Sequence, residues 1–225
     1  MTSLDKHEVF VLVSSASVPS EKIIGTKWVF KVKADHTLKE RVVVQGWEQV
    51  TRVDCGCACA LVGCIERIRM ALVIAAHEDW DILQRDVQAA FLHGSLQNKV
   101  YVNTPPGYGS IDAATGFHAM KLKIVCGLRQ SPRNWFNTTN DSLDNIGFTA
   151  TTSDPCVYTI GISDTFTILT LYVDDLLLLG GKTPVLKDLK RKLLERLTMT
   201  DMGDVSLVLG VKISGDREGG TLMIG

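Results

Sequence analysis

The chain has 225 residues, enough for one large domain or two small ones, and its 45% hydrophobic and 22% charged residues are typical of a globular protein. Its 24 basic and 25 acidic side chains leave a net charge of −1, so the molecule as a whole is neither a basic arm nor an acidic tail. The longest apolar run, residues 168–179, contains two aspartates and is too short for a membrane span, and the N-terminus lacks the pattern of a signal peptide. We therefore exclude membrane, secreted and collagenous classes and expect a soluble intracellular α/β or α+β protein.

The first distinctive segment is a basic hairpin. Residues 27–33 alternate, so a strand there places lysines on one face and Trp28, Phe30 and Val32 on the other. A turn at residues 35–36 and a returning strand over residues 38–46 complete the hairpin. Its basic face suits a nucleoside triphosphate or a nucleic-acid backbone. The alternative is a solvated edge hairpin whose lysines prevent aggregation, and the pattern favours neither.

Four of the six cysteines lie close together in sequence: Cys55, Cys57, Cys59 and Cys64. Their C-x-C-x-C-x4-C spacing lacks the paired C-x2-C of common zinc sites, and no export signal supports disulfides. Free thiols in a reducing compartment are the expectation.

The remaining elements follow from periodicity, caps and breakers. In chain order we predict a helix over 65–77, a strand over 80–86, a short helix over 89–94 and a small strand over 100–102. A helix from Ser131 to Gly147 follows, and then strands over 156–160, 166–172 and 176–179. The last elements are a helix that begins at Pro184 and a final hairpin over 205–213 and 221–224; the buried stripe of that helix consists of Leu186, Leu189, Leu193 and Leu197.

The residues with the clearest chemistry are three aspartates. Asp174 and Asp175 lie between two apolar strands, which predicts a hairpin with both carboxylates at its tip. Adjacent carboxylates repel unless a cation neutralises them, and hard oxygen ligands suit Mg²⁺ or Mn²⁺. Asp86 ends another apolar strand, and the carbonyl of Val87 could also face a metal. Three aspartates on two strand ends would hold two cations for in-line displacement at phosphorus. The alternatives are an ordinary Asp-Asp turn and a helix N-cap at Asp86.

Eight segments point to a family because they occur together and in order: residues 24–33, 44–49, 84–94, 105–108, 127–136, 153–158, 172–175 and 199–203. In these segments the chain resembles the reverse transcriptase domain of Ty1/copia-type LTR retrotransposon polyproteins, from about His7 to the C-terminus.

The resemblance implies an α+β, right-hand polymerase fold of fingers and palm, with an antiparallel palm sheet, packed helices and a thumb largely missing from this truncated copy. It implies a single domain over residues 1–225. Within it, a fingers hairpin covers about 22–62, a palm with an inserted fingers segment covers about 80–200, and a primer-grip-like hairpin covers about 203–225.

The resemblance also assigns the catalytic and metal-binding residues. Asp86 and Asp174 match the family's metal ligands, Asp175 matches the adjacent acidic partner, and Val87 contributes its carbonyl. Two Mg²⁺ or Mn²⁺ ions would bind there, and the reaction would be transfer of a nucleotide to a primer 3′-hydroxyl.

Further positions match the family's nucleotide-binding residues. Lys39 and Arg41 would contact the incoming triphosphate. Phe91 would place a ring against the sugar and select deoxynucleotides, with an ordinary core phenylalanine as the alternative. Gln130, with its neighbours Arg129 and Arg133, would contact template or nucleotide.

The implied partners are an RNA or DNA template with its primer, deoxynucleoside triphosphates and the remainder of a polyprotein, with no membrane. The expected location is the cytoplasm, in a virus-like particle, or the nucleus. Three departures from the family pattern, Gln45, Cys59 and Cys126, leave an alternative open. In that alternative the chain is a catalytically inactive, decayed remnant that still binds nucleic acid.

Overall fold

The computed structural model describes residues 10–14, 18, 23–32, 36–50, 62–87, 90, 99–105, 107, 118–122, 127–181, 184–197, 199–204, 207–208, 211–216 and 221–224. The chain divides into two compact units. The first comprises residues 1–60 and 91–137, and the second comprises residues 61–90 and 138–225. Helices and mostly antiparallel sheets are both present, which confirms the predicted α+β class.

The first unit contains a four-stranded sheet in the order β1-β7-β6-β2. Its strands are β1 (Phe10–Ser14), β7 (His118–Leu122), β6 (Val100–Asn103) and β2 (Ile23–Ile24). The β1–β7 and β6–β7 pairs are antiparallel, whereas β2 pairs with β6 in parallel. Ile24, Val102 and Met120 are buried in it. Of these strands, only β6 was predicted from the sequence.

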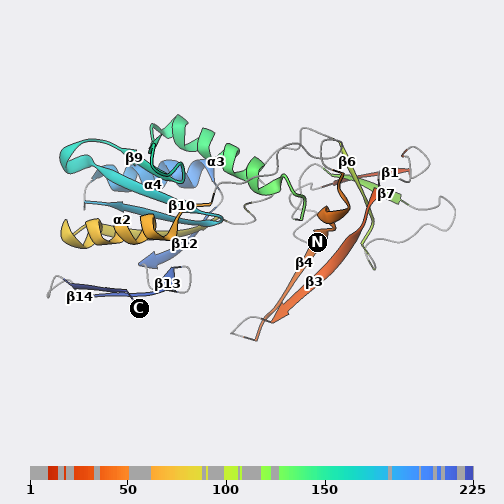
Figure 1. Ribbon diagram of the computed structural model, residues 1–225, viewed down its shortest axis with the longest axis horizontal. Coiled ribbons are helices and arrows are strands. Elements are labelled where there is room, and N and C mark those ends of the chain that lie inside the picture. Colours follow the sequence, from red (N-terminus) through yellow and green to blue (C-terminus); the bar gives the residue numbers. More distant parts are fainter. Residues whose placement is uncertain are drawn as a thin grey trace. The chain divides into compact units, whose positions relative to one another are not determined.

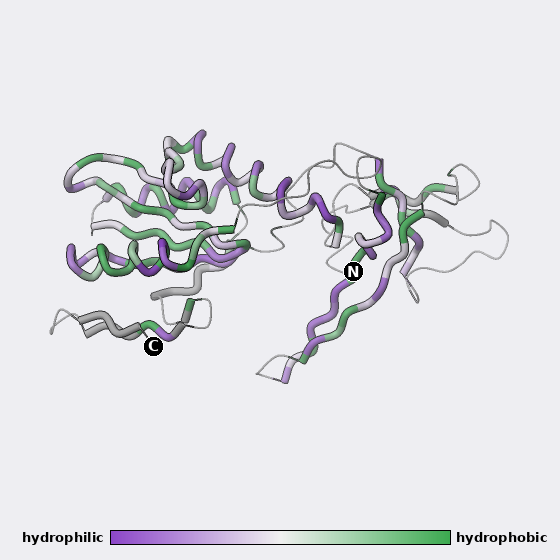
Figure 2. The backbone as a smooth tube through the Cα atoms, viewed as in Figure 1, coloured by the Kyte–Doolittle hydropathy of each residue, from purple (hydrophilic) through white to green (hydrophobic). Residues whose placement is uncertain are grey.

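The predicted basic hairpin is also in this unit, and its register confirms the two faces. It consists of β3 (Thr26–Val32) and β4 (Leu38–Val44), which pair antiparallel from Thr26↔Val44 to Val32↔Leu38. Because successive side chains alternate, one face carries the basic side chains and the other carries most of the large apolar ones. Figure 2 shows that both strands of the hairpin contain hydrophilic and hydrophobic stretches.

The segment after β4 is held by a set of contacts, here called the clamp, between residues 46–49 and residues 127–129. The 3₁₀-helix η3 (Gly46–Glu48) is held by Arg129, which donates from Nε to the Gly46 carbonyl at 3.0 Å and from Nη2 to the Trp47 carbonyl at 3.3 Å. The backbone N–H of Arg129 donates to Oε1 of the buried Gln49 at 2.8 Å. Gly46 and Gly127 meet at this contact, so close that a Cβ on Gly46 would lie 2.1 Å from the Gly127 carbonyl oxygen. These contacts fix the backbone of η3 against the turn at residues 127–130.

The second unit is built on a six-stranded sheet in the order β12-β5-β11-β10-β9-β8. The strands are β5 (Asp81–Val87), β8 (Thr149–Ala150), β9 (Val157–Ile160), β10 (Thr167–Tyr172), β11 (Asp175–Gly180) and β12 (Met199–Asp204), with the 3₁₀-helix η5 (Ser163–Thr165) between β9 and β10. The central strands β10 and β11 take up the longest apolar run of the sequence and are buried almost throughout.

Helices cover both faces of this sheet (Figure 1). Helix α2 (Ile65–His77) packs Ile68 and Leu72 against Leu177 and Leu179, in a core that also takes in Ile82. Leu178 has the opposite orientation on β11 and lies with Leu193 of α4 (Pro184–Arg196). The predicted leucine stripe of α4 is buried, which confirms that helix.

Helix α3 (Ser131–Ile146) runs from the first unit into the second and lies on the α4 side of the sheet. There Asn140 Oδ1 accepts a hydrogen bond from the Tyr158 hydroxyl at 3.2 Å. The helix ends at Gly147, as predicted, because φ of +107° there lets the Gly147 and Phe148 N–H groups bond back to the Leu143 carbonyl.

A three-stranded sheet of β13 (Leu207–Val208), β14 (Val211–Asp216) and β15 (Thr221–Ile224) follows β12. Val208 and Ile213 join the core around α2. The predicted strand over 221–224 is β15, and it pairs with β14. The predicted single strand over 205–213 is wrong, because residues 207–208 form β13, which pairs antiparallel with β14, and β14 begins only at Val211. None of the described helices is long and apolar enough to cross a membrane. The predicted short helix over 89–94 lies, apart from residue 90, outside the described residues.

Candidate active site

The candidate active site lies where strand β5 ends beside the start of strand β11. Asp86 and Asp175 are direct partners in the antiparallel β5–β11 pair. Direct partners have their Cβ atoms about 4.5–5.5 Å apart and point to the same face of the sheet. That face is the one covered by α2, since Asp175 shares the alternation of Leu177 and Leu179. Two aspartates that are 89 positions apart in sequence are thereby brought together.

Asp174 belongs to the two-residue turn that joins β10 to β11 between the paired residues Tyr172 and Asp175. The other turn residue, Val173, has φ of +57°, a conformation that a β-branched residue rarely adopts. Such strain costs roughly 1–3 kcal/mol and is found at functional sites. The backbone N–H of Val87 donates to the Asp174 carbonyl at 2.9 Å, which ties the end of β5 to this turn. The predicted hairpin with both carboxylates at its tip is therefore confirmed as local geometry.

Gln84 is a site residue that the sequence analysis did not identify. It is buried, two positions before Asp86 on the same face of β5, and its side-chain amide donates a hydrogen bond to the Asp175 carboxylate. Gln84 pairs with Leu177, so it is the diagonal neighbour of Asp175 across the two strands. The two-residue spacing from Asp86 was visible in the sequence, but the register with β11 was not.

The electrostatics of the site favour a cation. Burial first, then the carboxylate of Asp174 and that of Asp86, raise the pKa of Asp175 above its ordinary value, whereas the hydrogen bond from Gln84 acts in the opposite direction. Carboxylates that repel each other in this way are hard oxygen donors, so their chemistry fits Mg²⁺ or Mn²⁺. Among the residues that the structure describes, no three His, Cys, Asp or Glu side chains are grouped closely enough to hold a metal ion as they stand. Coordination would therefore require the side chains to rotate toward a common point.

The raised pKa of Asp175 predicts a pH dependence of stability. The folded chain holds the proton of Asp175 more tightly than the unfolded chain does. The contribution of this proton to the free energy of unfolding is therefore complete below about pH 4 and is lost as the pH rises through the raised pKa. Asp175→Asn should remove this decline. Melting temperatures of both proteins between pH 4 and pH 7, with a chelator present, measure it.

A matched control is Asp188→Asn on α4, because Lys192 and then Arg191 lower the pKa of Asp188. Its contribution has the opposite sign and is lost as the pH falls. If the melting temperatures of wild type and Asp175→Asn change with pH in the same way between pH 4 and pH 7, the decline does not come from Asp175.

The residues that we predict to bind the nucleotide and its triphosphate lie in the first unit. Lys39 and Arg41 are exposed, two positions apart on β4, and share one face of the hairpin with Lys27 and Lys31. Gln130 is in the turn before α3, where its Oε1 accepts a hydrogen bond from Gln49 Nε2 at 3.1 Å. The three aspartates and Val87 belong to the second unit.

Several predicted positions fall outside the described residues, namely Phe91, Cys55, Cys57, Cys59 and Cys126. Cys64 and Cys156 are free thiols, as expected. Burial and then the nearby Asp154 raise the pKa of the Cys156 thiol to about 11, which makes it unreactive. Trp135 of α3 is buried and therefore belongs to the core.

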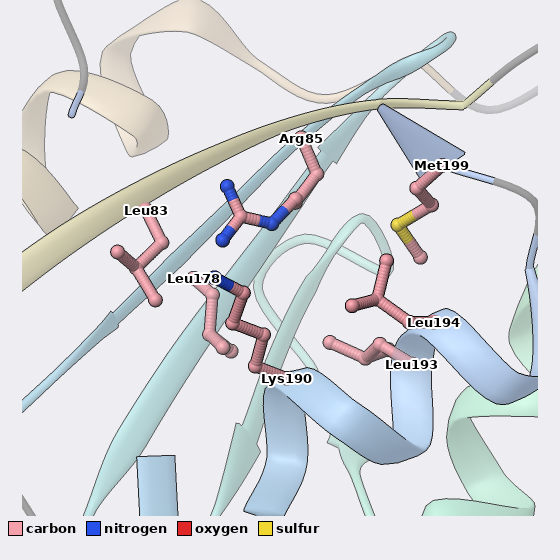
Figure 3. A pocket seen from close by; sticks show the side chains of 7 residues that line it. All are labelled: Leu83, Arg85, Leu178, Lys190, Leu193, Leu194 and Met199. Carbon is pink, nitrogen blue, oxygen red and sulfur yellow. The ribbon is translucent and has the colours of Figure 1, made fainter. Parts of the chain in front are cut away.

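A small pocket lies on the other face of the sheet, between β5, β11 and α4 (Figure 3). Its lining residues are Leu83, Arg85, Leu178, Lys190, Leu193, Leu194 and Met199. Arg85 is buried, and its Nη1 donates to the Gln84 carbonyl at 2.6 Å. Because side chains alternate along β5, Arg85 and Asp86 point to opposite faces. The pocket is therefore separate from the carboxylate site.

Comparison with known proteins places these features in a family. A family model described as reverse transcriptase (RNA-dependent DNA polymerase) matches residues 7–224. The retrovirus-related Pol polyprotein from transposon TNT 1-94 of Nicotiana tabacum is 36% identical over 225 residues, covering 96% of this chain and 17% of the polyprotein. That from transposon RE2 of Arabidopsis thaliana is 32% identical and covers 86% of this chain and 14% of the polyprotein. The transposon Ty1-DR1 Gag-Pol polyprotein of Saccharomyces cerevisiae is 24% identical over 89% of this chain. The chain spans less than a fifth of the length of these relatives.

Proposed function

The chain belongs to the reverse transcriptase family of Ty1/copia-type retrotransposon Pol polyproteins, and from that premise we propose that it is an RNA-directed DNA polymerase domain that uses divalent cations. The observation that carries the proposal is the pairing of Asp86 with Asp175 on adjacent strands, next to Asp174 in a tight turn. In the corresponding interpretation of the fold, the six-stranded sheet is the palm and the β3–β4 hairpin belongs to the fingers.

Asp86 and Asp174 would hold the cations, with Asp175 and the Val87 carbonyl beside them. The bound cations supply charge neutralisation at the phosphates and lower the pKa of the primer 3′-hydroxyl. The contribution of the protein is to hold these ligands in place. Gln84 orients the Asp175 carboxylate, and the Val87 N–H fixes the turn that carries Asp174. Phosphoryl transfer requires little covalent chemistry from the protein, so positioning and charge are what these residues provide.

Lys39 and Arg41 would bind the triphosphate of the incoming deoxynucleotide. Arg41 offers a planar fork that can contact phosphate oxygens in pairs, and Lys39 offers a point charge. Phe91 and Gln130 complete the proposed nucleotide site, with Phe91 excluding a 2′-hydroxyl. Template and primer are the proposed nucleic-acid partners.

The experiment that tests the proposed function is primer extension on an RNA template with Mg²⁺ or Mn²⁺. Extension with deoxynucleoside triphosphates that disappears when a chelator is added is the expected result. Binding of the primer-template without extension, under conditions in which a control reverse transcriptase extends it, would instead support the non-catalytic remnant.

A further inference from the structure

The odd-numbered face of the β3–β4 hairpin concentrates positive charge. It carries Lys27 and Lys31 from β3, and Lys39 and Arg41 from β4, with only Val29 and Val43 between them. Lys31 and Lys39 are direct cross-strand partners, and like charges in that arrangement destabilise a hairpin. All four cationic residues are exposed. A surface that keeps this unfavourable arrangement is complementary to a polyanion.

Trp47 extends this face with an exposed aromatic ring. It follows β4 in η3 and is 59% exposed, and Lys27 Nζ lies 4.8 Å from the centre of its ring. One side of the ring therefore faces a cation of the basic face. The backbone beneath the ring is held by Arg129 and by the close Gly46–Gly127 contact. The nearest acid in sequence, Glu48, accepts a hydrogen bond from the Gly25 N–H at 2.7 Å.

We propose that Trp47 is a stacking platform for a base of single-stranded nucleic acid whose phosphates lie along Lys27 and Lys31. An aromatic ring beside a track of cations is the combination that binds single strands, because every base has a π-face and every phosphate a charge. The inference rests on the proposed function and assigns the single-stranded part of the template to this face.

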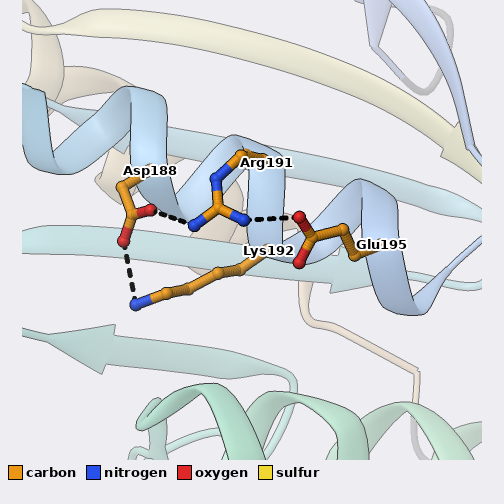
Figure 4. Close-up of polar contacts among 4 residues, drawn as sticks. All are labelled: Asp188, Arg191, Lys192 and Glu195. Atoms are coloured by element: carbon orange, nitrogen blue, oxygen red, sulfur yellow. Dashed lines mark hydrogen bonds and ion pairs between the residues drawn. The ribbon is translucent and has the colours of Figure 1, made fainter.

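Other charged or aromatic surfaces of the described residues lack this combination. On α4, Asp188 forms ion pairs with Arg191 at 2.6 Å and with Lys192 at 2.8 Å, and Arg191 also pairs with Glu195 (Figure 4). Those cations are partly neutralised within their own helix. On the even-numbered face of the hairpin, Phe30 is 67% exposed, but its cross-strand partner is Glu40.

The test measures binding of the full chain to fluorescein-labelled oligo(rU) and oligo(dT) of twenty nucleotides by anisotropy, over a range of salt concentrations. Trp47→Ala should weaken binding about tenfold, within the range for loss of one stacked base, without changing the salt dependence. Trp47→Phe should retain most of the affinity. Lys31→Gln should instead reduce the slope of log K against log salt by about one.

Phe30→Ala is the matched control, because it removes another exposed ring, from the opposite face of the hairpin, and should not change binding. Tryptophan fluorescence supplies a second measurement: the oligonucleotide should quench it in wild type and much less in Trp47→Phe. If Trp47→Ala binds like wild type while Lys31→Gln weakens binding, the stacking inference is wrong, and the basic face binds the oligonucleotide without help from Trp47. An equal loss in Phe30→Ala would also overturn the inference. If none of these variants weakens binding, the role proposed for the hairpin fails as well.

Discussion

Gly127→Ala is expected to destabilise the first unit by about 2–5 kcal/mol, from a left-handed backbone and an overpacked contact together. Gly127 has φ of +102°, and a Cβ there would lie 2.4 Å from the Val44 carbonyl oxygen and 2.8 Å from the Val44 nitrogen. Backbone atoms cannot rotate away as a side chain can. Because the total stability of a domain is about 5–15 kcal/mol, the change should be visible as a large fall in the urea midpoint.

Two further glycines separate the causes. Gly46→Ala meets the Gly127 carbonyl oxygen at 2.1 Å and therefore tests the contact from its other side. Gly107→Ala has φ of +77° with nothing within 4 Å, so it should cost only about 1 kcal/mol, as expected for backbone strain alone. Similar small losses in all three variants would show that η3 and the turn at residues 127–130 can move apart, and that their contacts do not fix the backbone.

The second large effect concerns catalysis. Asp174→Asn and Asp86→Asn should each lower the rate of nucleotide incorporation about a thousandfold or more, because a metal ligand contributes several kcal/mol to the transition state. Both variants keep the size of the side chain, so the fold should be retained. Single-turnover incorporation with saturating Mg²⁺ measures the rate.

Asp164→Asn is the matched control for these variants. Asp164 is an exposed carboxylate of η5 in the same unit, away from the β5–β11 strand ends, and its substitution should leave the rate unchanged. A rate for Asp174→Asn within a few-fold of wild type would remove Asp174 from the catalytic site.

Much of the second unit was predictable because its signals are local. The apolar run interrupted by Asp174 and Asp175 predicted the hairpin, and the leucine spacing after Pro184 predicted α4. By contrast, β12 was not predicted as a strand. Its residues include Thr200, Asp201, Gly203 and Asp204, which have little strand preference, and it is a strand because the edge of β5 is available to pair with it.

Register was the information that the sequence lacked. The pairing of Asp86 with Asp175, and the placement of Gln84 beside them, depend on which residue of β5 faces which residue of β11. The two faces of the β3–β4 hairpin were easier to predict, because the alternation of its residues and the short connection between its strands determine them. Trp47 lay within a recognised segment, but its exposure and its contact with Lys27 depend on the clamp made by Arg129, 82 positions away.

The proposed chemistry requires that Asp86, Asp174 and Asp175 together bind the catalytic cations. Anomalous X-ray scattering from a crystal of the wild-type chain with Mn²⁺, primer-template and a deoxynucleoside triphosphate tests it most directly. We expect a manganese peak within coordination distance of the Asp86 and Asp174 carboxylates, and no such peak for Asp174→Asn. Ordered nucleotide with no manganese at these carboxylates in the wild-type crystal would contradict it.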